Sequence, residues 1–153
     1  MFLPVLPTVD NPNMDEHANE RLAARHLFDK VYRRALRKRM TAAFQGHNRH
    51  LLKLNEQAQH NRHYEGIHLV SLDEIKGSEG RDNDFDTEFL PVREHVQNRW
   101  INVAIAFLEG KSLPPVELIR KDNTYFVRDG HHRISVARAM RFQSIEAEVV
   151  AEE

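Results

Sequence analysis

The apolar residues of this 153-residue chain follow a helical period in its first third. From Asp15 to Phe44 an apolar residue returns roughly every four to five positions, which predicts one long amphipathic helix that ends at Gly46. A second, more polar helix is expected over residues 50–60, and it has too few apolar residues to be stable alone. We therefore expect residues 1–65 to form a helical arm that packs on the rest of the chain or on another copy of itself.

Residues 66–153 show shorter apolar segments, which are typical of a small domain of helices and strands. Four apolar runs predict strands: residues 67–72, 116–119, 124–128 and 145–150. Helical spacing predicts two helices, over residues 92–107 and 131–141, and a polar loop is expected over residues 77–86. The predicted fold class is α+β, a small sheet with helices and an N-terminal helical extension.

The composition suits a water-soluble chain with a core, since 41% of its residues are hydrophobic and 29% are charged. There is no cysteine, which excludes disulfides and thiol chemistry. Residues 1–12 are interrupted by Pro4 and Pro7, and they lack the long apolar run of a signal peptide or a membrane span. We expect a cytoplasmic location and no membrane partner.

The net charge of −1 hides an uneven distribution. Residues 1–66 carry 11 Lys and Arg against 7 Asp and Glu, a net of +4, whereas residues 67–153 carry 11 against 16, a net of −5. This change supports a boundary near Glu65 and Gly66. Five basic residues of the arm are a candidate nucleic-acid contact: Arg33, Arg34, Arg37, Lys38 and Arg39. A solvated helix face is the alternative, because acidic residues interrupt the arm and no aromatic ladder accompanies the arginines.

Candidate chemistry gathers where the strand at residues 124–128 meets the helix at 131–141. The sequence there is Asp129, Gly130, His131, His132 and Arg133. A glycine lets the backbone turn tightly, and the first N–H groups of a helix form a ready anion site, to which two imidazoles and a guanidinium add donors. The pattern favours a phosphate site. The alternative is a plain helix start that Asp129 caps; a metal ion at the adjacent histidines is disfavoured, because neighbouring helical residues diverge by about 100°.

These segments resemble the ParB/sulfiredoxin-like superfamily. The resemblance covers about residues 67–150 and rests on SLPPVELI at 112–119, YFVRDGHHR at 125–133 and IEAEVV at 145–150. Residues 71–91 are similar to the first conserved box of uncharacterised "ParB-like nuclease" proteins, and the DGHHR corner also resembles that of the free-serine-kinase branch. The resemblance implies a small mixed sheet whose corner surrounds the phosphates of a nucleotide. Sulfiredoxin activity is excluded, because His131 stands where those enzymes need a cysteine.

Further site residues follow from the polar loop and from the strand at 116–119. The resemblance implies that Arg81 lies near the nucleotide, and Glu117 matches an acidic residue that sulfiredoxins carry after two prolines. Asp84 and Asp86 would share one face of an extended segment and are candidate Mg²⁺ ligands, with a solvated Asp-rich loop as the alternative. An outward-facing strand residue is the alternative for Glu117.

Two functions stay open. The first is a nucleotide-dependent phosphotransferase or hydrolase that binds a nucleoside tri- or diphosphate with Mg²⁺. Gly130 and the helix N-terminus would cradle the phosphate oxygens, while His131, His132 and Arg133 would donate to them and stabilise transition-state charge. Asp129 or Glu117 would orient the attacking hydroxyl or water, or bind Mg²⁺. The second is a non-catalytic nucleotide-sensing or DNA-associated module that uses the basic arm for nucleic acid or self-association. Release of phosphate from nucleotide would separate the two.

Overall fold

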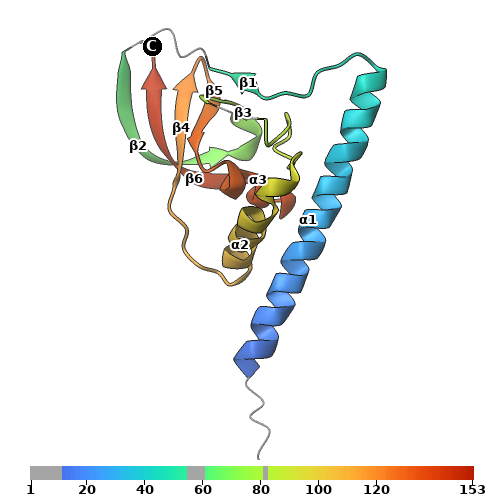
Figure 1. Cartoon of the computed structure of the whole chain (residues 1–153). Coiled ribbons are helices and arrows are strands. Elements are labelled where there is room, and N and C mark those ends of the chain that lie inside the picture. The colour runs from blue at the N-terminus through green and yellow to red at the C-terminus, as the bar shows by residue number, and fades with distance from the viewer. Residues whose placement is uncertain (1–11, 55–60, 81–82) are drawn as a thin grey trace, which may run out of the picture.

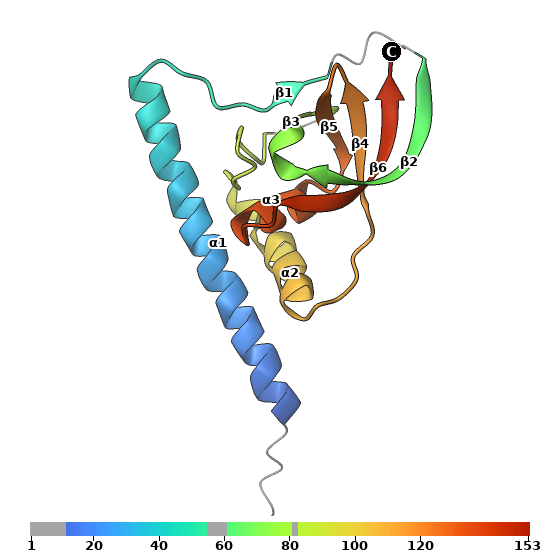
Figure 2. The same ribbon diagram turned by 180° about the vertical axis from the view of Figure 1, so that it is seen from behind.

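One long helix and a compact α+β body make up the computed structural model, which describes residues 12–54, 61–80 and 83–153 (Figure 1). Helix α1 (Pro12–Phe44) runs along one side of the body, next to α2 (Gln97–Leu108) and α3 (His131–Ala139), and the view from behind shows the same arrangement (Figure 2). Two 3₁₀ turns, Leu72–Glu74 and Glu94–Val96, complete the helical elements of these residues. Within this part of the chain, none of the helices combines the length and the apolar character needed to span a membrane.

Six strands form one mixed sheet in the order β1-β3-β5-β4-β6-β2. Their bounds are β1 Leu52–Lys53, β2 Arg62–Ser71, β3 Ile75–Ser78, β4 Val116–Lys121, β5 Thr124–Asp129 and β6 Ser144–Glu152. The pairs β4–β5 and β2–β6 are antiparallel, whereas β1–β3, β3–β5 and β4–β6 are parallel. The α+β class with a small mixed sheet and an N-terminal helical extension is therefore confirmed.

The hairpin β4–β5 brings the candidate site together. Asp122 and Asn123 form its tip with φ angles of 48° and 61°, the left-handed conformation that a two-residue hairpin turn requires and that Asp and Asn tolerate. The resulting register places Glu117 of β4 opposite Asp129 of β5. The end of β5 thus lies beside the start of β4, and α3 begins directly after it.

A single tryptophan joins the three helices. Trp100 of α2 is fully buried, its ring meets that of Phe28 from α1 edge to face at 5.5 Å, and its Nε1 donates to the buried Ser135 Oγ of α3 at 2.8 Å. Phe28 is 2% exposed, so α1 contributes to the same core as the sheet. Burial of an aromatic side chain is worth about 1.5–3 kcal/mol, which makes the arm an integral part of the fold.

A buried carboxylate holds the far end of the sheet. Glu152 of β6 accepts from Arg62 Nε at 2.9 Å and from Lys121 Nζ at 3.0 Å. Burial alone would raise the pKa of Glu152, but the two basic partners outweigh it and leave that pKa below its ordinary value. The ion pairs therefore join three strands, β2, β4 and β6.

The structure corrects the expectation for the segment after α1. Residues 52 and 53 form strand β1 on β3 rather than part of a helix, and residues 55–60 lie outside the described range. Leu51 and Leu54 are buried, and their spacing of three is also compatible with a helix, so the sequence pattern was ambiguous. The sequence pattern does not predict strand β3, whose last two residues fall within the expected polar loop. The charge boundary at residues 65 and 66 falls within β2, whose first residues already pair with β6.

Candidate functional site

The corner between β5 and α3 depends on a glycine. Gly130 has φ 105° and ψ 19°, a left-handed conformation that suits residues without a Cβ. A Cβ atom here would lie 2.5 Å from Cγ1 of Val116, which is closer than non-bonded carbons approach. Gly130 is also the N-cap of α3, and no side chain of the described residues caps this helix, so the alternative role of Asp129 as a cap is wrong. The backbone can therefore turn sharply from β5 into α3.

His131 is held by a buried serine. Its Nε2 lies 2.8 Å from the Oγ of Ser78, which is fully buried on β3. The Ser78 hydroxyl also lies 3.3 Å from the carbonyl oxygen of Val127, to which it can donate. The N–H of Gly80 donates to Ser78 Oγ at 3.4 Å. If Ser78 donates to Val127, then Nε2 of His131 carries the proton and donates to Ser78. This arrangement fixes one ring nitrogen and hence the orientation of the imidazole.

Phe85 packs against both histidine rings. Its buried ring is stacked with that of His131 at 6.3 Å and 15°, and it meets His132 edge to face at 5.3 Å and 88°. Both imidazoles are half-buried. The loop before α2 therefore fixes the side chains at the start of α3. The contacting residues are separated in sequence by about half of the domain.

Arg133 holds the corner against the loop before β4. Its Nη1 donates to the carbonyl oxygens of Pro114 and Pro115, the latter at 2.9 Å, and its Nη2 donates to Oδ2 of Asp129 at 2.6 Å. The guanidinium side chain is 16% exposed, whereas that of Asp129 is 60% exposed. Both terminal nitrogens of Arg133 thus donate to groups of the protein itself. The side chain of Asp129 is more exposed to the cleft than that of Arg133.

The corner opens onto a cleft of about 220 Å³. Its lining includes Asp129, residues 130–133, Asp84 and Arg99. Arg99 extends from α2, and it makes no hydrogen bond or ion pair with the described part of the chain. Arg99 could not be identified from the sequence. It directly precedes the core residue Trp100 on a helix, and no sequence motif distinguishes it from an ordinary surface arginine.

The expected acidic residues are only partly brought together. Asp84 lines the cleft, and its Oδ1 lies 3.0 Å from Nε2 of His95. Asp86 is 1% exposed and accepts from Arg49 Nη2 at 2.9 Å and from the N–H groups of residues 88 and 90. A Mg²⁺ ion at Asp86 would have to displace those partners. Glu117 is exposed on β4 and does not line the cleft; Arg81 lies outside the described residues.

Some of the basic residues of α1 form ion pairs or hydrogen bonds with the α+β body. Arg34 and Lys38 pair with Glu88, the former at 3.5 Å. Arg39 donates to the carbonyl oxygen of Val92 at 3.4 Å, and Arg33 donates to a carbonyl within its own helix. Three of the five cations therefore help to attach α1 to the segment between β3 and α2, and a role in nucleic-acid binding stays a prediction.

Comparison with known proteins found a distant similarity among solved structures. No family model matches the chain, and no curated protein matches it. Among solved structures, the chain is similar to sulfiredoxin from Arabidopsis thaliana, with 17% sequence identity and a TM-score of 0.39, over 54% of this chain and 82% of that one. At this TM-score the similarity says nothing about activity, and both the superfamily and its nuclease-like subgroup stay predictions.

Proposed function

We propose that the protein binds the phosphate groups of a nucleotide in the cleft at the start of α3. The observation that carries the proposal is the convergence of the α3 N-terminus, the imidazoles of His131 and His132, and the Arg99 guanidinium on one cleft. A helix N-terminus favours anions through its N–H groups and its partial positive charge. Arg99 adds a full positive charge to the lining of the cleft from a second helix, α2.

The dimensions of the cleft favour a phosphate group rather than a whole enclosed ligand. Pockets that enclose drug-sized molecules have volumes of about 300–1,000 Å³. At about 220 Å³, this cleft is smaller, so the base and ribose would lie largely outside it. Asp84 and Asp129 at the cleft would hold Mg²⁺ together with phosphate oxygens, because Mg²⁺ in such sites usually has one or two carboxylate ligands and retains several waters.

Turnover of the nucleotide, by hydrolysis or phosphotransfer, is the first form of this function. Asp129 would orient the attacking water or hydroxyl, since its side chain is exposed at the cleft, and the cationic groups would stabilise charge on the transferred phosphoryl group. The second form is nucleotide binding without turnover. It is favoured by one observation: Glu117, the other candidate base, does not line the cleft.

Thermal unfolding with ligands tests the proposal. The melting temperature of the full chain would be measured with millimolar phosphate, MgATP, MgADP and MgCTP, and released phosphate would be assayed in parallel. Binding raises the melting temperature, and phosphate release selects turnover over plain binding. Arg99→Ala should reduce the shift, whereas Arg37→Ala, which removes an exposed arginine of α1 far from the cleft in sequence, should not. No shift with any of these ligands would contradict the proposal.

A further inference from the structure

We propose that His17, Glu20 and Glu109 form a binding site for a transition-metal ion of the zinc type, which would connect the start of α1 to the end of α2. This site is separate from the cleft at α3 and does not depend on the function proposed for it. Of the residues that the structure describes, these three are the group of imidazole and carboxylate ligands that lies close enough to hold one ion. One ligand atom from each lies within 4.8 Å of the other two.

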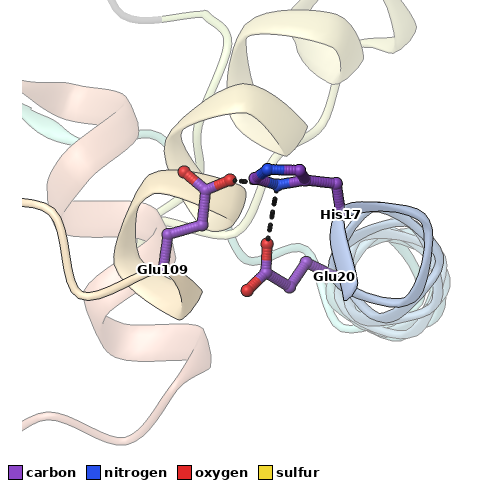
Figure 3. Close-up of side chains that lie close together, drawn as sticks. All are labelled: His17, Glu20 and Glu109. Carbon is purple, nitrogen blue, oxygen red and sulfur yellow. Dashed lines mark ion pairs between the residues drawn. The ribbon is translucent and has the colours of Figure 1, made fainter. Parts of the chain in front are cut away.

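The geometry comes from two helices. His17 and Glu20 are three residues apart on α1, so their side chains lie on one face of that helix. Glu109 follows the last residue of α2 and meets them from the other side, as Figure 3 shows. His17 Nδ1 lies 2.9 Å from Glu109 Oε1 and 3.6 Å from Glu20 Oε2. Ligand atoms of a tetrahedral zinc ion lie about 3.3 Å apart at ordinary bond lengths, a value between these two distances.

The local charge favours a cation. The Oε2 atom of Glu20 is buried and has no hydrogen-bond partner among the residues that the structure describes, a costly state for a carboxylate oxygen. Glu109 occupies the C-cap of α2, where partial negative charge collects, and the last turn of that helix has no basic residue. Lys111 pairs with Oε2 of Glu109 and leaves Oε1 directed at His17.

The donor set selects the type of ion. Mg²⁺ and Ca²⁺ prefer oxygen ligands alone, whereas imidazole with carboxylates suits zinc and related first-row ions. Three protein ligands leave one position for water. A metal-free alternative is a protonated His17 that forms ion pairs with both carboxylates. The two accounts differ in whether zinc binds here, so a binding experiment decides between them.

The experiment uses the full chain after treatment with a chelator, and titrates it with Zn²⁺ by calorimetry. The sequence has 10 histidines, so weak surface binding is expected, and variants must locate the site. His17→Ala should weaken the tightest zinc binding by at least about tenfold, since even the loss of a supporting residue costs about 10–100-fold. His26→Ala removes an exposed histidine of the same helix and is the matched control, with unchanged affinity expected.

Two further measurements complete the test. Glu109→Gln keeps the size of the side chain but removes its charge, and it should weaken zinc binding in the same way. Zn²⁺ should raise the melting temperature of the wild type but not of His17→Ala, and equal concentrations of Mg²⁺ should have no effect on this site. The proposal is overturned if the wild type binds no zinc. It is also overturned if His17→Ala, like the control His26→Ala, binds zinc as tightly as the wild type. Trp100 fluorescence would confirm that each variant is folded.

Discussion

Replacement of Gly130 by alanine tests how the corner is built. The substitution places a Cβ in a left-handed conformation with φ 105°, which costs about 1–3 kcal/mol for a residue other than glycine. It also places that Cβ 2.5 Å from Val116 Cγ1, and overpacking of this kind costs about 1–3 kcal/mol. Together, the two effects should lower the free energy of unfolding by about 2–6 kcal/mol.

Gly66 offers a matched control. Its φ is 100°, nearly that of Gly130, but a Cβ at this position would have no atom within 4 Å. Gly66→Ala therefore carries the conformational cost alone, and the difference between the two variants isolates the contact with Val116, at about 1–3 kcal/mol. Urea unfolding followed by the fluorescence of the single tryptophan, which is buried, measures both variants.

A double variant provides a second check. Val116→Ala removes the Cγ1 atom that the new Cβ would meet, so the combined variant should be more stable than the sum of the two single losses implies, by about 1–3 kcal/mol. If Gly130→Ala is no less stable than Gly66→Ala, and the effects of Gly130→Ala and Val116→Ala are additive, then close packing against Val116 is not the reason why a glycine is needed at position 130.

Three other predictions concern the site and the fold. Arg133→Ala should weaken phosphate binding by about 1.5–3 kcal/mol and also lower the urea midpoint, because its guanidinium holds the loop before β4. Arg99→Ala should weaken phosphate binding and leave the urea midpoint unchanged, so equal midpoints for the two variants would contradict this prediction. Phe28→Ala should destabilise the full chain by about 3–5 kcal/mol in urea unfolding, since its ring packs on Trp100, and a loss below about 1 kcal/mol would show that α1 is only loosely attached. The pKa of Glu152 is lower when folded than when unfolded, so its contribution to stability is present above about pH 4.5 and is lost as pH falls through the lowered value. Glu152→Gln should therefore destabilise the protein at pH 7 and reduce the loss of stability as pH falls below about 4.5, measured by urea unfolding at each pH. Parallel pH profiles of wild type and variant would contradict the assignment.

The parts of the fold that were predictable from sequence have strong local patterns. The long amphipathic period of α1, the apolar runs of β4, β5 and β6, and the glycine at the start of α3 each follow from residues close together in the chain. Strands β1 and β3 have two and four residues, too few for a period to show, and their pairing joins segments that are distant in sequence. Short strands of this kind depend on tertiary contacts rather than on local preference.

The candidate site shows the same division. Residues 129–133 were predictable because glycine and cationic groups coincide with a strand-to-helix junction. The partners of this segment come from elsewhere: Ser78 from β3, Phe85 from a loop and Arg99 from α2. None of these three has a local pattern that distinguishes it from a core residue or a surface residue. Asp86 illustrates the converse, because the sequence offers it as a candidate Mg²⁺ ligand or a solvated loop residue, and the structure shows it buried, accepting hydrogen bonds from Arg49 and the backbone.

Nuclear magnetic resonance with MgATP as the titrant tests most directly whether the cleft at α3 binds phosphate. Backbone amide shifts of the ¹⁵N-labelled full chain would be followed up to millimolar nucleotide. We expect the largest saturable changes at the amides of residues 130–133, with a change at the Arg99 side chain. A titration that leaves these signals unmoved, or that moves only signals of α1, would contradict a phosphate site at this corner.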